Sequence, residues 1–331
     1  LPEFTTAGFS QPGFRILPTI GQYDGVLIVN EKGKIVWYTQ TTGMGFTMQA
    51  QLSTDGEHVI YNQVYSDNDK GNLVWESLIG SETTTLDIPY LAHDFTQLSD
   101  GTITVIANDI QETEEDSEPV IGDQIIEIAR DGTETVVWST WDHYIPGESG
   151  EIENIDTDDW THSNAIDYDP EEDVYYLSIL KLGSVIKIDR STGEIIWTLG
   201  GDFSDFTTEG EPTTLGRHHQ FQIQDDIITI FINGDVGDEE GSQVVQFELD
   251  ESDMTATELY RYGSYQAPYV YALGAVSMID TDTMDITWST SGYLEQVQND
   301  SLDWQLEADI GHIFGYSSFV ETMYAELNQA E

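Results

Sequence analysis

Three histidines occupy the same position in three successive segments of similar sequence. His93 opens HDFTQLSDGTITVIAN, His162 opens HSNAIDYDPEEDVYYLS and His219 opens HQFQIQDDIITIFIN. An Asp follows each histidine seven residues later, and an alternating apolar stretch comes next. Equal positions in neighbouring units of a repeated fold can face one common space, so we expect the three imidazoles to meet at one site.

Groups that suit an anion accompany these histidines. Asn164 comes two residues after His162, and strand alternation places both side chains on one face. Arg217 and Lys181 are two of only ten cationic side chains in the chain. These residue types predict an anion-binding site, although Lys181 could instead pack its stem along a hairpin with its head in water.

The remaining histidines have other expected roles. Strand alternation turns His218 away from His219, so we expect His218 to support the site. His58 lies in a polar turn, where we expect it to be solvated, and two further histidines also fall outside the repeated position. A strongly negative surrounding field should favour the protonated form of the site imidazoles.

The composition excludes several classes of function. The 331 residues include 62 Asp and Glu against 10 Lys and Arg, a net charge of −52. This balance argues against nucleic acid or an anionic membrane surface as a partner, and it suggests a high-salt or marine habitat. Cysteine is absent, so neither a disulfide nor a thiolate nucleophile is available. No stretch approaches the roughly 18 apolar residues of a membrane span.

The elements that would position the histidines are short β-strands. Segments rich in Val, Ile, Thr, Tyr, Phe and Trp alternate with Gly, Asp and Asn turns, which is typical of antiparallel sheets. A hairpin phrase ends at Trp37, Trp138 and Trp197, and looser versions end at Trp75, Tyr260 and Trp304. Six endings predict six units of roughly 55 residues, slightly longer than compact propeller repeats. The predicted fold is an all-β, six-bladed β-propeller.

The two ends of the sequence complement each other. Residues 24–37 read as an outer hairpin without inner strands, and residues 311–324 read as strand material without a hairpin. N- and C-terminal strands sharing one blade would close the propeller and remove an open sheet edge. We therefore predict an N-terminal extension at 1–23 and a single propeller domain at 24–331. A β-sandwich is the alternative, but it explains neither the repeat nor the complementary ends.

Two long segments around these histidines resemble a known family. Residues 159–201, DWTHSNAIDYDPEEDVYYLSILKLGSVIKIDRSTGEIIWTLGG, are similar to the pattern D-W-x-H-x-N-S-I-x-Y-D followed by S-S-R-H-x-S-x-I-x-K-I-D-R-x-T-G-x-I-x-W-x-L-G-G of the bacterial arylsulfate sulfotransferases. Residues 218–235, HHQFQIQDDIITIFINGD, resemble that family's Q-H-x-A segment and its strand ending F-D-N-G. Residues 93–109 give a weaker match. The resemblance is to the shorter, single-propeller branch, because 1–23 is too short for an additional N-terminal domain.

The resemblance implies both an activity and residue roles. Members of the family are six-bladed propellers that pass a sulfuryl group from an aryl sulfate to a phenol through a sulfohistidine, without a nucleotide donor. By motif, His219 would be the nucleophile, and His93, His162 and Asn164 would bind the sulfuryl oxygens. Such a transferase needs no cofactor and no metal, and its partners are an aryl sulfate donor and a phenolic or other hydroxyl acceptor.

This chain departs from the family at one site position. The sulfate-binding Arg of the family falls on Leu180, and Lys181 occupies the next place, where alternation would turn its side chain the other way. A point charge does not replace a forked guanidinium equally. Donor binding is therefore expected to be weakened, altered in specificity or lost.

Two other functions remain open. A catalytically degenerate propeller could serve as a secreted or surface binding or assembly module, which Leu180 favours. A metal-dependent lyase or hydrolase could use the three histidines as ligands. The acidic turns at 66–71 and 233–241 could hold Ca²⁺, but neither has EF-hand spacing. The resemblance, and a first residue Leu1 that suggests processing, favour an extracytoplasmic location, whether periplasmic, secreted or on the cell surface.

Overall fold

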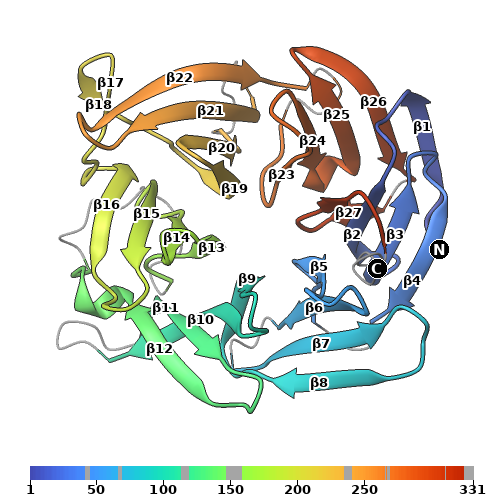
Figure 1. The fold of residues 1–331 in the computed structure, drawn as a ribbon, viewed down its shortest axis with the longest axis horizontal. Coiled ribbons are helices and arrows are strands. Elements are labelled where there is room, and N and C mark those ends of the chain that lie inside the picture. The colour runs from blue at the N-terminus through green and yellow to red at the C-terminus, as the bar shows by residue number, and fades with distance from the viewer. Residues whose placement is uncertain are drawn as a thin grey trace, which may run out of the picture. The chain divides into compact units, whose positions relative to one another are not determined.

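The protein is described by a computed structural model. The described residues are 1–41, 45–65, 69–112, 119–146, 159–234, 241–264, 266, 269–309 and 311–323. Of the two acidic turns considered as Ca²⁺ sites, residues 66–68 and 235–240 therefore lie outside the described residues. The chain forms two compact units, one of residues 1–89 and 263–331 and the other of residues 90–262. Each unit contains three β-sheets (Figure 1).

Residues 90–262 form three sheets, which we name after the histidine at the start of each. The His93 sheet contains β9 (Leu91–Gln97), β10 (Ile103–Gln111), β11 (Val120–Ile128) and β12 (Glu134–Ser139), followed by the 3-10 turn η1 (Thr140–Asp142). The His162 sheet contains β13 (Ser163–Asp169), β14 (Val174–Ile179), β15 (Ser184–Asp189) and β16 (Ile195–Gly200). The His219 sheet contains β19 (His218–Gln224), β20 (Ile227–Ile232), β21 (Gln243–Asp250) and β22 (Thr255–Tyr262), with β17 (Thr207–Thr208) and β18 (Glu211–Pro212) at its outer edge.

Residues 1–89 and 263–331 form the other three sheets. The β5 sheet contains β5 (Ala50–Leu52), β6 (His58–Val64), β7 (Gly71–Ser77) and β8 (Thr83–Asp87). The β23 sheet contains β23 (Ala275–Met278), β24 (Thr283–Trp288), the 3-10 turn η2 (Ser289–Ser291), β25 (Tyr293–Gln298), β26 (Ser301–Ala308) and β1 (Phe4–Gly8). The β2 sheet contains β2 (Phe14–Gly21), β3 (Gly25–Asn30), β4 (Ile35–Gln40), β27 (His312–Phe314) and β28 (Ser318–Val320).

Six sheets built around antiparallel meanders are the blades of a six-bladed β-propeller, so the predicted fold class is confirmed. The predicted hairpins are present as β3–β4, β11–β12 and β15–β16. In the β15–β16 turn, Gly193 has φ +73°, and a Cβ there would lie 2.5 Å from the carbonyl oxygen of Val137. This turn therefore requires glycine. Neither 3-10 turn in the described residues has the length or apolar character to cross a membrane.

The two chain ends meet in the β2 sheet, as predicted from the complementary termini. C-terminal strands β27 and β28 both pair with β2, next to the N-terminal hairpin β3–β4. The N-terminal strand β1 adds a fifth strand to the β23 sheet. These pairings cover the sheet edges that a chain terminus would otherwise leave open.

Residues 1–23 differ from the expected extension, because they contain β1 and β2. The sequence pattern did not predict strand β2, because this strand includes Pro18 and Arg15, which are untypical of a buried strand. Arg15 is nevertheless buried, since its Nε lies 2.7 Å from the Oδ2 of Asp285 and its guanidinium stacks on Trp304. A buried ion pair thus explains a strand that hydrophobic periodicity does not predict.

Large apolar side chains fill the spaces between neighbouring sheets of a unit. Trp138 lies in the core between the His93 and His162 sheets, and Trp197 lies in the core between the His162 and His219 sheets. Trp75 differs from the prediction, because it lies in β7, the third strand of its sheet, and the polar strand β8 follows it. Trp138 and Trp197 are buried on the outermost strand of their sheets, whereas Trp304 is buried on β26, which β1 covers.

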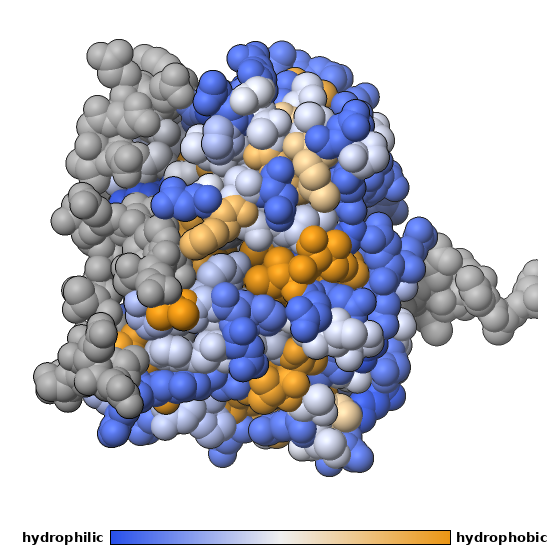
Figure 2. Space-filling model, turned by 90° about the vertical axis from the view of Figure 1, so that its left-hand side faces the viewer, coloured by the Kyte–Doolittle hydropathy of each residue, from blue (hydrophilic) through white to orange (hydrophobic). Residues whose placement is uncertain are grey.

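Polar side chains cover most of the described surface in the view of Figure 2, with apolar patches between them. Exposed apolar side chains on outer strands include Val136 of β12 and Ile196 of β16. Scattered exposures of this kind are normal for a folded protein.

Candidate active site

The three histidines in equal register lie at the start of three inner strands within residues 90–262. His93 is the third residue of β9, His162 immediately precedes β13, and His219 is the second residue of β19. Strand β13 contacts both β9 and β19. The ring centroids of His93 and His162 are 4.6 Å apart, and both rings influence the pKa of His219. We call these three residues the histidine cluster.

A register shift lies near the histidine in all three of these strands. The pairing of β9 shifts between Leu91 and Phe95, that of β13 between Ser163 and Ala165, and that of β19 between His218 and Phe221. A bulge adds one residue and re-aims the neighbouring side chains. Strict alternation therefore fails at this point, and both His218 and His219 are buried.

His219 has a neutral ring with a defined tautomer. Its Nδ1 lies 2.5 Å from the Oδ1 of Asn233. An amide oxygen only accepts hydrogen bonds, so Nδ1 carries the proton and Nε2 keeps its lone pair. Burial lowers the pKa of His219 well below its ordinary value of 6.5 despite this bond, and electrostatic interaction with His162 lowers it further. At neutral pH the ring therefore presents an unprotonated Nε2.

His162 is the member of the cluster whose protonated form is favoured by its neighbours. Its Nδ1 hydrogen-bonds to the carboxylate of Asp159. Burial acts to lower the pKa of His162, but the hydrogen bond and charge of Asp159, with the charge of Asp123, raise it above 6.5. The residue also has φ +54°, a left-handed conformation that costs a non-glycine residue roughly 1–3 kcal/mol. Its neighbours must therefore hold it in place.

His93 is neutral. Burial and the positive charge of His162 lower the pKa of His93 to about 3, against the opposing effects of Asp159 and a hydrogen bond to the backbone of Ser163. The expected protonation of all three imidazoles is therefore wrong for His93 and His219. The reason is that loss of water outweighs the distant negative field, and only His162 touches a carboxylate.

Lys181 supplies a second positive charge beside His162. Lys181 and Leu180 lie in the turn after β14, so strand alternation does not govern their directions. The backbone N–H of Lys181 donates to the carbonyl of Thr161 at 3.1 Å, and its ammonium donates to the carbonyl of Asp159. Its charge lowers the pKa of both Asp159 and His162. The expectation that Lys181 faces away from the site is therefore wrong.

Asn164 and His218 link the His162 sheet to the His219 sheet. The Nδ2 of Asn164 donates to the carbonyl of His218 at 3.1 Å. The two ring nitrogens of His218 lie 3.0 and 3.2 Å from the carbonyl oxygens of Gly216 and Ser184. Burial lowers the pKa of His218. These contacts fix the start of β19 and thus the base of His219.

Arg217 lies just before β19 and is half-buried. Its backbone carbonyl accepts from the N–H of Asn233 at 2.8 Å. Within the described parts of the chain, its Nε is buried without a hydrogen-bond partner and its guanidinium forms no ion pair. The structure brings Asn164 and Lys181 to the histidine cluster, whereas the contacts of Arg217 do not place its guanidinium there.

Three residues that sequence reasoning did not assign complete this site. Asp159 and Asn233 had a signal, since both lie in quoted family motifs, D-W-x-H and the strand ending N-G. Asp123 of β11 had none. It is buried, and its Oδ2 accepts from the Oγ1 of Thr161 at 2.6 Å and the N–H of Ser163 at 2.7 Å. Burial and the charge of Asp159 raise the pKa of Asp123 to about 6.

The spacing of the histidine cluster does not favour a shared metal ion. Among the described residues, the one group of at least three metal-binding side chains whose ligand atoms lie within 4.8 Å of one another is Asp55, Glu57 and His58. That group lies at the start of β6 on a turn, with both carboxylates exposed. The three site histidines do not form such a group.

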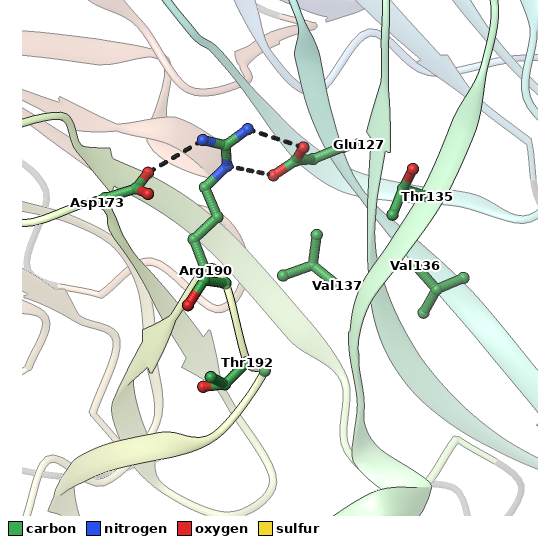
Figure 3. Close-up of a pocket in the computed structure, with 9 residues that line it drawn as sticks. Glu127, Thr135, Val136, Val137, Asp173, Arg190 and Thr192 are labelled. Carbon is green, nitrogen blue, oxygen red and sulfur yellow. Dashed lines mark hydrogen bonds and ion pairs between the residues drawn. The ribbon is translucent and has the colours of Figure 1, made fainter.

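A separate pocket of about 360 Å³ lies between the His93 and His162 sheets (Figure 3). Arg190 crosses it, with Nε and Nη2 donating to Glu127 at 2.5 and 3.0 Å and Nη1 donating to Asp173 at 3.0 Å. Each of its three nitrogens therefore donates a hydrogen bond within the protein. We interpret this arrangement as a clamp between two sheets and not as an anion site.

The chain matches one protein family and several solved structures. The family model Arylsulfotransferase (ASST) matches residues 16–309. A protein of unknown function from Bacteroides caccae is similar over 94% of this chain and 100% of its own, with 12% identity and a TM-score of 0.59. The periplasmic gluconolactonase PpgL of Pseudomonas aeruginosa is similar over 94% and 99%, with 10% identity and a TM-score of 0.53. At these identities the structures share a fold alone. A comparison with curated proteins gave no match.

Proposed function

Because the chain belongs to the arylsulfotransferase family, we propose that it moves a sulfuryl group from an aryl sulfate to a phenolic or other hydroxyl acceptor. The group would pass through a sulfohistidine at His219, with no nucleotide sulfate donor. The observation that carries this proposal is the bond between Asn233 and the Nδ1 of His219, which leaves a neutral ring with a free Nε2. A neutral, oriented imidazole is what nucleophilic attack on sulfur requires.

The first step transfers the sulfuryl group to the enzyme. The Nε2 lone pair of His219 forms a bond to sulfur while the bond between sulfur and the aryl oxygen breaks. The electron pair leaves on the phenolate oxygen, which then takes a proton. Positive charge develops on the ring, and the carbonyl oxygen of Asn233, which accepts a hydrogen bond from Nδ1–H, stabilises it.

Charges around the cluster would hold the sulfuryl oxygens. The imidazolium of His162 and the ammonium of Lys181 supply two positive charges close to one another. His93 and Asn164 supply neutral polar groups. Lys181 thus would take over part of the role that the family gives to an Arg at the position of Leu180. Preorganised donors of this kind lower the barrier by stabilising charge on the transferring group.

The second step releases the group to the acceptor. The acceptor oxygen bonds to sulfur, the electron pair of the N–S bond returns to Nε2, and the proton of the acceptor hydroxyl is released to solvent. His219 returns to its starting state with Asn233 still on Nδ1. The two steps together give a ping-pong reaction.

A binding or assembly module without activity is the second candidate, and Leu180 favours it. A single ammonium cannot grip a sulfate with the forked geometry of a guanidinium. Against it stands the ordered tautomer of His219, which a binding module does not need. We also propose an extracytoplasmic location, which the family resemblance supports; the similar Pseudomonas protein is itself described as periplasmic.

The proposal is tested with 4-nitrophenyl sulfate in high salt, with and without a phenol acceptor. We expect acceptor-dependent release of nitrophenol, and mass spectrometry of the quenched enzyme should find an added sulfuryl group on His219. His219→Gln should abolish both, whereas His58→Gln, at the half-buried first residue of β6, should retain both. Nitrophenol release that does not depend on the acceptor would indicate a sulfatase. No release and no adduct would leave the binding module.

A further inference from the structure

The backbone of His162 is strained and needs an outside support. With φ +54°, this residue adopts a left-handed conformation that side chains with a Cβ disfavour. The carbonyl of His162 accepts from the N–H of Leu180 at 3.1 Å, and its ring meets Asp159. The carbonyl of Thr161 likewise accepts from the N–H of Lys181 at 3.1 Å. These contacts hold the two carbonyls around His162, and they leave the Thr161 hydroxyl and the Ser163 N–H to another partner.

Asp123 makes contact with both flanking residues. One carboxylate oxygen, Oδ2, accepts the hydroxyl of Thr161 at 2.6 Å and the backbone N–H of Ser163 at 2.7 Å. Thr161 immediately precedes His162 and Ser163 immediately follows it. Hydrogen bonds to a charged acceptor are stronger than neutral ones, so a single oxygen closes a tight loop around His162.

The aspartate comes from a different sheet than the histidine. Asp123 lies on β11 of the His93 sheet, and the segment before β13 runs along that strand. Ile121 forms a parallel bridge with Asp159, and the N–H of Trp160 donates to the carbonyl of Ile121 at 2.8 Å. The backbone of Asp123 is itself fixed, since its N–H and carbonyl both bond to the Oγ1 of Thr140 at 3.0 and 2.8 Å. The support is therefore rigid.

We propose that Asp123 is a positioning residue, whose buried carboxylate clamps Thr161 and Ser163 and so holds His162 in the conformation that faces the histidine cluster. Asp123 also acts on the charge of the His162 ring. Two carboxylates, Asp123 and Asp159, act on one imidazole, and both favour its charged form.

The groups that act on His162 come from several elements. Asp159 is on its own segment, Asp123 is on β11, and Lys181 is on the turn after β14. His93 on β9 and His219 on β19 are the other titratable neighbours. Of these, the two carboxylates favour protonation of His162, and Lys181 opposes it. Loss of the Asp123 charge should therefore lower the pKa of His162.

The test compares Asp123→Asn with Asp167→Asn. Asp167 of β13 is a matched control, because burial raises the pKa of this carboxyl to about 6 as well, yet it accepts from the backbone of Tyr168 and Ile223 and not from the segment of His162. The pKa of His162 is measured by NMR on protein with ¹⁵N-labelled histidine, with His162→Gln to assign its signal. We expect it to fall in Asp123→Asn and to stay unchanged in Asp167→Asn.

Kinetics give a second measure, which rests on the proposed function. Asp123→Ala removes the clamp and should lower kcat/KM about 100-fold, the usual effect of a misplaced site group. Asp123→Asn retains an acceptor oxygen, so it should recover part of the rate while its alkaline limb moves to lower pH. If Asp123→Asn does not fold, Thr161→Val should still expose the Ser163 amide to faster hydrogen exchange.

Each outcome is decisive. An unchanged pKa of His162 in Asp123→Asn, or equal shifts in both Asn variants, would overturn the proposal, and so would an unaltered exchange rate of Ser163 in Thr161→Val. The NMR result is independent of turnover. A shifted pKa in a protein without sulfuryl transfer would therefore support the clamp while the proposed function fails.

Discussion

Replacement of Asn233 by Ala tests the nucleophile directly. The Oδ1 of Asn233 lies 2.5 Å from the Nδ1 of His219 and accepts a hydrogen bond from it. Positive charge forms on this ring as Nε2 bonds to sulfur, so the hydrogen bond strengthens in the transition state. A hydrogen bond to a charged group contributes about 1.5–3 kcal/mol. At about 1.4 kcal/mol for each factor of ten, Asn233→Ala should slow sulfuryl transfer about 10- to 150-fold.

The assay is a stopped-flow measurement of the nitrophenol burst without acceptor, which reports the first half-reaction alone. Asn62→Ala is the matched control, because Asn62 is equally buried but its Oδ1 accepts backbone N–H groups of Met48 and Gln49 in the other unit. We expect this control to reduce stability and to leave the burst rate per folded molecule unchanged. An equal burst in Asn233→Ala and wild type would refute the assigned role of the hydrogen bond.

Asn233→Asp separates orientation from charge. A carboxylate at this position still accepts the Nδ1 proton, but it favours the imidazolium form and so raises the pKa of His219. The protonated ring cannot attack, so the acid limb of the burst rate should move to higher pH and the rate should recover in alkaline solution. A variant that stays slow at every pH would show that geometry, and not protonation, limits it.

Three further outcomes follow from the structure. In wild type, the acid limb of kcat/KM should lie below pH 6.5, because the lowered pKa of His219 delays its protonation to that range. The alkaline limb should lie above pH 6.5, because His162 has a raised pKa and loses its proton there. Initial rates measured as a function of pH check both limbs. Arg15→Met leaves Asp285 buried without its ion-pair partner and should lower the free energy of unfolding by about 3–5 kcal/mol. Arg261→Met removes an exposed ion pair and should change the free energy of unfolding by about 0–1 kcal/mol. Denaturant unfolding in high salt measures both. Treatment with EDTA should leave the transfer rate within about twofold, because the histidine cluster lacks the spacing of a metal site; a large loss restored by Zn²⁺ would favour the hydrolase.

The fold could be predicted because its pattern is local and repeated. Strand alternation, polar turns and a hairpin ending on an aromatic residue recur along the chain, and the equal register of three histidines follows from the same repeat. The shared blade could be inferred from two incomplete ends. Strand β2 could not, because Arg15 is tolerated there only through Asp285, which lies 270 residues along the chain.

The charge states of the site could not be predicted for a related reason. The net charge suggested protonated imidazoles, yet the pKa values of His93 and His219 are set by burial among neighbouring strands. The direction of the Lys181 side chain depends on the turn after β14, where the alternation of strand side chains ends. Asp123 lies 39 residues before His162 in the sequence, in a strand with no motif. Contacts between sheets decide all of these features, and a linear pattern does not carry them.

The scarcity of cations in this chain gives the buried ones a particular meaning. Only ten Lys and Arg face 62 acidic residues, yet Arg15, Lys181 and Lys187 are buried. Lys187 of the His162 sheet lies 2.7 Å from Glu251 of the His219 sheet, and Arg15 joins the β2 and β23 sheets. Salt screens exposed charges strongly and buried pairs much less. High salt would therefore relieve repulsion across the acidic surface while the buried Arg15–Asp285 pair, and the charge of Lys181 beside the histidine cluster, keep most of their strength. The Lys187–Glu251 pair is screened more, because Glu251 is 41% exposed. The dependence of stability on salt and the chemistry of the site are then separate properties of one sequence.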